Sequence, residues 1–319
     1  YCIDSNIDPN GRSLFNDFKT LFQYVLMLKK IKPFLVITFT IKPNLYATLA
    51  ARLSKASVFN NVTGLGTIFI EQSRMKKVIV QMLKFSLSFS EKIFLQNEDD
   101  AQLFLDNKIA EEKQLVIVAG SGIDTRKFVP VTGESNQPKT VFLLVARLLK
   151  EKGIYEYIEA GRMLKEEGAN VECWLCGSFD DNNPSSVSRD LVESAVKDEV
   201  LKYLGFSSEI QKIIPQADCI VLPSYREGTS RTLLEAGSMG KPLIAANVPG
   251  CKEIIDDGKN GFLCQVKDSL DLKEKMKEFV ELDAESREQM GVFSRDKIVK
   301  EYDVSIVNDR YLSEIRRLT

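Results

Sequence analysis

The feature that most constrains the fold is a regular alternation of short apolar runs with longer segments of helical periodicity. The short runs have the length of strands, and most are apolar throughout instead of alternating with polar residues. Strands of a parallel sheet covered on both faces have this pattern, because neither face meets water. The predicted strands are 34–39, 92–96, 115–118, 140–146, 171–176, 219–223 and 242–245.

Helical segments separate these strands, and this alternation predicts a doubly wound α/β architecture. A chain of 319 residues is long enough for two such domains, each with its own core. We predict a first domain at 1–127, a linker rich in proline and glycine at 128–139, and a second domain at 140–302. The amphipathic helix at 303–319 is expected to pack back on the first domain. The predicted helices are 15–30, 45–54, 72–88, 99–107, 154–167, 186–201, 230–239, 270–282 and 304–317.

Composition excludes several classes of protein. The formal net charge of -2 offers no basis for nucleic-acid binding, so any anion site must be local. The sequence has no histidine, which excludes Ser-His and Cys-His nucleophilic machinery and metals held by histidine. The six cysteines are predicted to be reduced thiols of a cytosolic protein, and no metal site is expected. No apolar run is long enough for a transmembrane helix.

The first candidate site is a loop between a strand and a helix in the stretch DCIVLPSYREGTSRTLLEAGSMGKP, residues 218–242. This loop lies at the carboxyl end of a parallel strand, where doubly wound folds bind ligands. The start of the following helix offers N–H groups and a partial positive charge to a phosphate. Glu227 and Glu235 can accept hydrogen bonds from sugar or ribose hydroxyls. Spacing alone favours the alternative of a capping glutamate and a solvated glutamate.

The second candidate site is the segment VARLLKEKG, residues 145–153. Arg147 closely follows a predicted strand, and Lys152 precedes a predicted helix. Two cations at this point can neutralise a diphosphate leaving group as a divalent metal would. An ordinary solvated charged loop is the alternative.

Together these residues resemble the retaining family 4 glycosyltransferases of GT-B fold. The resemblance rests on the E-x7-E spacing of Glu227 and Glu235, the flanking PSYREG and LLEA, and the upstream ARLLKEKG. Motifs of the first half resemble the subgroup that acts on polyprenyl-diphosphate-linked sugars in bacterial surface-glycan assembly. They are TFTIKPNLYATLAARL at 38–53, NVTGLGTIF at 61–69, FLQNEDDAQLF at 94–104 and GSGIDTRKF at 120–128.

The resemblance implies a role for each matching residue. Arg147 and Lys152 would hold the donor diphosphate, Glu227 would bind hydroxyls of the transferred sugar, and Glu235 would bind the ribose. Backbone N–H groups of the turn Gly228, Thr229 and Ser230 would face sugar or phosphate. Three residues would border the nucleoside, and three glycines would line the acceptor side of an interdomain cleft. These are Gly177, Ser178 and Phe206 for the nucleoside and Gly64, Gly66 and Gly122 for the acceptor.

The implied reaction moves a hexose or N-acetylhexosamine from a UDP-sugar to a lipid-linked saccharide, with retention of configuration and without a metal or other cofactor. Such enzymes begin with a strand and a glycine-rich loop, and none precedes Tyr1. A chain that lacks this first strand is expected to bind donor but transfer poorly. A nucleotide-sugar-binding module and a sugar-nucleotide epimerase therefore remain alternatives.

The segment 74–92 interleaves basic residues with apolar ones. An ordinary amphipathic core helix has this pattern. A helix lying on an anionic bilayer has it as well, and this would suit a lipid-linked acceptor. The expected location is therefore cytoplasmic, with peripheral contact to the inner membrane as the sharper interpretation.

Overall fold

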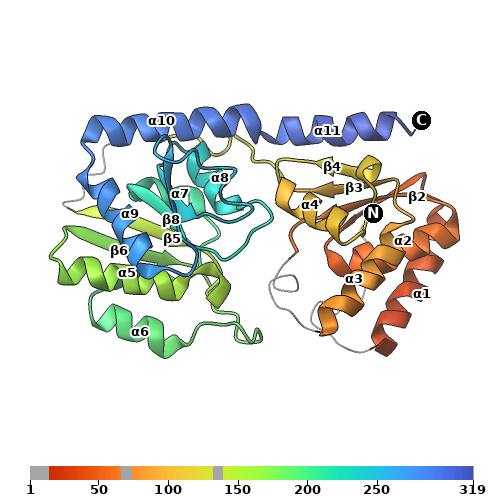
Figure 1. The fold of residues 1–319 in the computed structure, drawn as a ribbon, viewed down its shortest axis with the longest axis horizontal. Helices are drawn as coiled ribbons and strands as arrows, with labels where there is room; N and C mark the ends of the chain where they lie inside the picture. Colours follow the sequence, from red (N-terminus) through yellow and green to blue (C-terminus); the bar gives the residue numbers. More distant parts are fainter. Residues whose placement is uncertain (1–13, 66–73, 132–138, 319) are drawn as a thin grey trace. The chain divides into compact units, whose positions relative to one another are not determined.

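The computed structural model describes residues 14–65, 74–131 and 139–318 (Figure 1). The chain divides into two compact units, one of residues 1–120 with 313–319 and one of residues 121–312. Most of the predicted linker, 132–138, lies outside the described residues. No helix in the described ranges is both long and apolar enough to cross a membrane.

The first unit contains a four-stranded sheet in the order β1-β2-β3-β4, with every neighbouring pair parallel. The predicted strands at 34–39, 92–96 and 115–118 are confirmed to within a residue. The second strand was not predicted, because Asn60 and Asn61 interrupt its apolar run. The strands are β1 (Leu35–Phe39), β2 (Ser57–Val62), β3 (Lys92–Leu95) and β4 (Leu115–Ile117).

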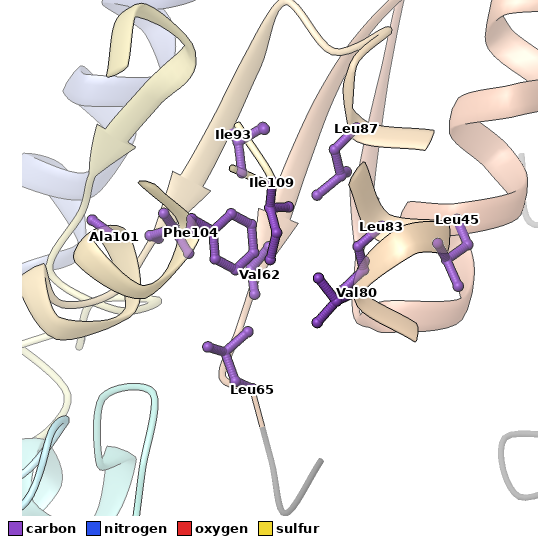
Figure 2. Close-up of a cluster of buried hydrophobic side chains, with 11 residues drawn as sticks. Leu45, Val62, Leu65, Val80, Leu83, Leu87, Ile93, Ala101, Phe104 and Ile109 are labelled. Atoms are coloured by element: carbon purple, nitrogen blue, oxygen red, sulfur yellow. The ribbon is translucent and has the colours of Figure 1, made fainter. Parts of the chain in front are cut away.

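Helices α2, α3 and α4 cover one face of this sheet. Figure 2 shows Leu45 of α2, Leu83 of α3 and Phe104 of α4 meeting Val62 and Ile93 of the strands in one buried cluster. Helix α1 packs on α2 through Tyr24 and Leu28. The helices of this unit are α1 (Leu14–Ile31), α2 (Ile41–Ser54), α3 (Arg74–Leu87) and α4 (Glu98–Asp106), with a short 3-10 turn η2 (Glu112–Gln114) before β4.

The second unit contains a six-stranded parallel sheet in the order β10-β9-β8-β5-β6-β7. Its central strands are mostly apolar and buried, and β8 and β9 are buried along their whole length, as predicted for strands covered on both faces. The strands are β5 (Thr140–Val145), β6 (Val171–Cys176), β7 (Leu201–Tyr203), β8 (Cys219–Leu222), β9 (Leu243–Ala246) and β10 (Gly261–Cys264).

Helices lie on both faces of the second sheet, so this unit is doubly wound. Figure 1 shows β5, β6 and β8 between α5 and α10. Helix α5 packs with α9, and α8 packs with α10. The helices are α5 (Ile154–Glu166), α6 (Arg189–Lys197), α7 (Ile210–Ile213), α8 (Arg231–Ser238), α9 (Ser269–Glu281) and α10 (Ala284–Glu301), with 3-10 turns η3 (Lys150–Lys152) and η4 (Ile214–Gln216). Helix α11 (Val304–Arg316) begins in this unit, and its residues from 313 onward belong to the first unit.

Several elements of the second unit differ from the prediction. The helix predicted at 186–201 ends at Lys197, and its last predicted residue opens β7. Strands β7 and β10 and helices α7 and α10 were not predicted. The buried side of α10 includes Gly291 and Ser294, so it has no continuous apolar stripe to reveal it.

Candidate functional site

The order of the second sheet reverses between β5 and β8, the position at which doubly wound folds bind ligands. From β5 the chain moves outward through β6 and β7, and then returns to the other side of β5 to form β8. Such a reversal leaves a crevice at the carboxyl ends of the two central strands. The loop after β5 carries Arg147 and Lys152, and the loop after β8 carries Glu227.

The structure brings Lys152 and Glu227 into direct contact. The Lys152 Nζ lies 2.5 Å from the Glu227 Oε1, and the two side chains are 21% and 14% exposed. Two hydrogen bonds hold the loops together beside this pair: the Tyr225 N–H donates to the Glu151 carbonyl at 2.8 Å, and the Ser224 hydroxyl donates to it at 3.0 Å. Lys152 and Glu227, which were predicted from separate motifs and lie 75 residues apart in the sequence, therefore belong to one site.

Gly153 sets the close approach of these two loops. Its φ is 72°, in the left-handed region that favours glycine. A Cβ at this position would lie 2.2 Å from the Pro223 carbonyl oxygen. Both the backbone conformation and the contact therefore require glycine, which places Lys152 directly over the end of β8.

Helix α8 positions Glu235 one loop further on. Ser230 is its N-cap, and the Ser230 Oγ accepts from the Leu233 N–H at 3.4 Å. The Glu235 Oε1 accepts a hydrogen bond from the Arg231 Nε at 2.8 Å, and the glutamate is only 13% exposed. The alternative of a fully solvated glutamate is therefore wrong.

The turn before α8 differs in one respect from the predicted anion cradle. The Ser230 N–H donates to the Gly250 carbonyl at 2.9 Å, so this donor already has an acceptor within the protein. The Glu227 N–H likewise donates to the Pro249 carbonyl at 3.0 Å. Gly228 and Thr229 lie between these two anchored residues, and their contact with a donor stays a prediction.

The residues predicted to border the nucleoside lie at the ends of β6 and β7. The Gly177 N–H donates to the Gly205 carbonyl at 2.9 Å, which places Gly177 beside Phe206. The ring of Phe206 is 73% exposed, so it is open to stack on a planar base. The Ser178 carbonyl accepts from the Leu148 N–H at 3.0 Å, which ties this loop to the loop of Arg147.

Two functional candidates of the same region were missed from sequence. Glu156 in α5 is buried, and its Oε1 accepts from the Tyr225 hydroxyl at 2.7 Å. Burial and then this hydrogen bond raise the pKa of Tyr225. Asp180, after β6, lies 3.4 Å from the Arg147 guanidinium. Neither contact follows from spacing, because the partners lie 69 and 33 residues apart.

The predicted acceptor-side glycines lie in separate parts of the chain. Gly64 follows β2 in the first unit with φ 129°. Gly122, in the second unit, packs against Val304 at the start of α11, so packing accounts for this glycine. Gly66 lies outside the described residues. Within the part of the chain that the structure describes, no three acidic or cysteine side chains form a group that could hold a metal ion.

Comparison with solved structures shows the fold. The crystal structure of Anabaena HepE in complex with UDP has a TM-score of 0.82 and 16% identity, with 94% of this chain and 82% of that chain covered. Sucrose-phosphate synthase from Thermosynechococcus elongatus has a TM-score of 0.81 and 16% identity, covering 98% of this chain and 80% of that one. The predicted architecture of two Rossmann-like domains, the GT-B fold, is thereby confirmed.

Comparison of sequences shows the family. The family described as Glycosyl transferases group 1 matches residues 126–297, and that described as Glycosyl transferase 4-like matches residues 2–97. A Campylobacter jejuni enzyme, N,N'-diacetylbacillosaminyl-diphospho-undecaprenol alpha-1,3-N-acetylgalactosaminyltransferase, is 30% identical, with 95% of this chain and 82% of that protein covered. The Escherichia coli UDP-Gal:alpha-D-GlcNAc-diphosphoundecaprenol alpha-1,3-galactosyltransferase is 25% identical, with 80% and 68% covered. The chain is a glycosyltransferase and belongs to the group 1 glycosyl transferase family.

Proposed function

We propose that this glycosyltransferase moves a hexose or N-acetylhexosamine from a UDP-sugar to a polyprenyl-diphosphate-linked saccharide in the assembly of a surface glycan. The observation that carries the proposal is the pairing of Lys152 with Glu227 at the crevice between β5 and β8. A cation for phosphate and a carboxylate for hydroxyls, side by side, fit the two ends of a nucleotide sugar. The names of the Campylobacter and Escherichia relatives, which include undecaprenyl-diphosphate sugars, support the acceptor class.

The donor would lie along the carboxyl ends of the second sheet. Phe206 would stack on the uracil, and Gly177 and Ser178 would border the nucleoside. The Glu235 carboxylate would accept hydrogen bonds from the hydroxyls of the ribose, which lies between the uracil and the diphosphate. Its contact with Arg231 orients this carboxylate. Arg147 and Lys152 would then take the diphosphate, and Glu227 would take the sugar hydroxyls.

The chemistry follows from where charge develops. Breaking the bond to the anomeric carbon leaves an oxocarbenium-like sugar and places negative charge on the diphosphate. Arg147 and Lys152 stabilise that charge most in the transition state, which lowers the barrier. We propose retention of configuration without a metal, with the leaving phosphate accepting the proton of the incoming hydroxyl on the same face. A trapped glycosyl–enzyme adduct would contradict this mechanism.

The test is a transfer assay. Purified full-length protein is incubated with a panel of UDP-sugars and a polyprenyl-diphosphate-linked sugar, and product formation is followed by mass spectrometry. One donor should give a product of one added sugar, and NMR of that product reads the anomeric configuration. Conversion of the donor without any acceptor, or no transfer from any UDP-sugar, would contradict the proposal.

Helix α3 supports a second part of the proposal, contact with the cytoplasmic face of a membrane. An ordinary core helix buries its apolar side chains, yet Val78, Met82 and Phe85 are 59%, 39% and 62% exposed. Lys77 and Lys84 are exposed on the same helix. An exposed stripe of apolar and basic side chains suits the interface of an anionic bilayer, where the acceptor lipid resides.

Liposome co-sedimentation tests this contact. The double variant Lys77→Gln, Lys84→Gln should weaken binding to vesicles containing anionic lipid, by roughly 1 kcal/mol per removed charge. The matched control is Lys19→Gln, Lys30→Gln, which removes two exposed lysines from α1. Equal loss of vesicle binding in both double variants would mean that binding depends only on the net charge of the protein. Unchanged binding of the α3 variant would refute the membrane contact.

A further inference from the structure

The charged residues assigned to the donor all have partners within the second unit. The Arg147 Nη1 lies 3.4 Å from the Asp180 Oδ2, and the Lys152 Nζ lies 2.5 Å from the Glu227 Oε1. A carboxylate therefore stands against each of the two cations proposed to hold the diphosphate. A diphosphate oxygen that contacts the same guanidinium and ammonium groups must compete with these carboxylates.

The position of Asp180 is built into the fold. The Asn183 N–H donates to the Asp180 carbonyl at 2.8 Å, which closes a turn that starts at Asp180, and the Asn183 Nδ2 lies 3.5 Å from the Asp180 Oδ2. The segment that follows is bonded to the loop of Arg147 itself: the Lys150 N–H donates to the Ser185 carbonyl at 2.8 Å. These two main-chain bonds fix the backbone that carries Asp180 beside the loop of Arg147, so the two side chains are held within reach of each other.

We propose that Asp180 and Glu227 are internal counter-ions that compete with the donor diphosphate for Arg147 and Lys152. The proposal rests on the proposed function, in which these two cations hold the diphosphate. Displacement also has a consequence for Glu227, because its carboxylate is released from Lys152 only when phosphate takes its place. Binding of the diphosphate thereby makes Glu227 available to the hydroxyls of the sugar.

The two counter-ions should differ in strength. Arg147 is 61% exposed and Asp180 is 30% exposed, so water screens their attraction. The Lys152–Glu227 pair is closer and less exposed, so it is less screened. Since a competing contact lowers the apparent affinity by the fraction of cation it occupies, loss of Asp180 should raise the affinity for UDP by about two- to fivefold. Loss of the Glu227 charge should raise it by about tenfold.

Isothermal titration calorimetry with UDP on the full chain tests the proposal. The main variant is Asp180→Asn, and its matched control is Asp181→Asn. Asp181 is the next residue and carries the same charge, but its carboxylate contacts Arg189 at 2.8 Å instead of Arg147. Asp180→Asn should bind UDP more tightly than Asp181→Asn, and the difference should vanish when Arg147→Ala is added to both.

The possible outcomes distinguish failure of the counter-ion proposal from failure of the proposed diphosphate site. Equal affinities for the Asp180→Asn and Asp181→Asn proteins would overturn the competition, and so would weaker binding in the Asp180→Asn protein, since that would make Asp180 a support for Arg147. If Arg147→Ala alone leaves UDP binding unchanged, the proposed diphosphate site itself fails. Thermal unfolding of each variant guards against a loss of fold.

Glu227→Gln provides an independent arm. UDP has no transferred sugar, so a residue that only binds sugar hydroxyls would leave UDP affinity unchanged on substitution. A counter-ion of Lys152 predicts tighter UDP binding together with loss of sugar transfer. Unchanged or weaker binding of UDP to the Glu227→Gln protein would overturn the role of Glu227 as a competitor.

Discussion

Both units carry a cluster of polar side chains at their strands, but the cluster of the first unit is neutral and buried, whereas that of the second unit is charged and partly exposed. In the first unit Thr38, Asn44, Thr48 and Asn60 are buried and neutral, and they bond to one another: the Asn60 Nδ2 donates to the Thr38 Oγ1 at 2.7 Å and to the Thr48 Oγ1 at 2.6 Å. In the second unit the corresponding groups are charged and partly exposed. A satisfied neutral network stabilises a core, whereas charges that remain partly open to solvent are available to a ligand.

The largest expected effect is on the charged group. Lys152→Ala should lower kcat by about 100- to 1000-fold, because it removes a cation from the place where the leaving group gains charge. Lys150→Ala is the matched control, since Lys150 lies in the same turn η3 and is exposed. Steady-state transfer kinetics should show near-normal turnover for the control. Near-normal turnover of the Lys152→Ala protein would contradict a catalytic role for Lys152 in the charged cluster.

The neutral network predicts the reverse pattern. Asn60→Ala should lower the free energy of unfolding of the first unit by about 2–4 kcal/mol, because it removes the acceptor of the buried Ser90 hydroxyl and the amide that donates to Thr38 and Thr48. Urea unfolding measures this loss. Asn107→Ala, which removes an exposed amide bonded to the Leu103 carbonyl, should cost much less. UDP binding should persist in both proteins. Loss of UDP binding in the Asn60→Ala protein would contradict a purely structural role for the neutral network.

Gly153 tests whether the approach of the two loops matters in itself. Gly153→Ala combines a left-handed backbone with an overlap on the Pro223 carbonyl, so we expect a loss of about 3 kcal/mol in stability and weaker UDP binding. Gly168 has the same φ of 72°, yet nothing lies within 4 Å of a Cβ built on it. Gly168→Ala should therefore cost only the backbone strain, about 1 kcal/mol. Similar losses in urea unfolding would show that the overlap is relieved at no cost.

The same contrast explains which strands could be predicted. Strand β8 is apolar throughout, and β5 and β6 are apolar beyond Thr140 and Glu172 at their starts, so their sequences identify them directly. Strand β2 is just as buried, but it carries the network residue Asn60 together with Asn61, and polar side chains mask an apolar run. Helix α10 buries Gly291 and Ser294, which carry little hydrophobic signal. Where burial is achieved by hydrogen bonding or by close backbone approach, periodicity cannot report it.

The sequence predicts the individual residues of the candidate site, but not which charged side chains contact one another. Glu227 and Lys152 each lie at the end of a predicted strand, which marks both as candidates. Only the strand order, with β8 beside β5, brings them together. Asp180 also follows a predicted strand, but an aspartate in a polar loop is most often solvated, so its position alone does not mark it as functional. Its importance depends on the backbone hydrogen bonds that anchor its loop to that of Arg147.

The smallest expected effect concerns a charge of the second unit with a structural role. Asp303 precedes α11 and accepts from the Ser305 hydroxyl at 2.6 Å and from the Thr125 hydroxyl at 2.5 Å. These hydrogen bonds, that of Ser305 first, hold the pKa of Asp303 well below its usual range. The contribution to stability is therefore present above the unfolded pKa of about 4 and is lost as the pH falls below it.

Asp303→Asn should remove this contribution, which we expect to be under about 1 kcal/mol after solvent screening. The difference in unfolding free energy between wild type and variant should be largest near pH 7 and should shrink on acidification to pH 3. Asp309→Asn, an exposed aspartate on the same helix, should show no such pH-dependent difference. UDP affinity should be the same in all three proteins. A change in UDP affinity on Asp303→Asn would mean that charge in the second unit acts on the donor site beyond the crevice of β5 and β8.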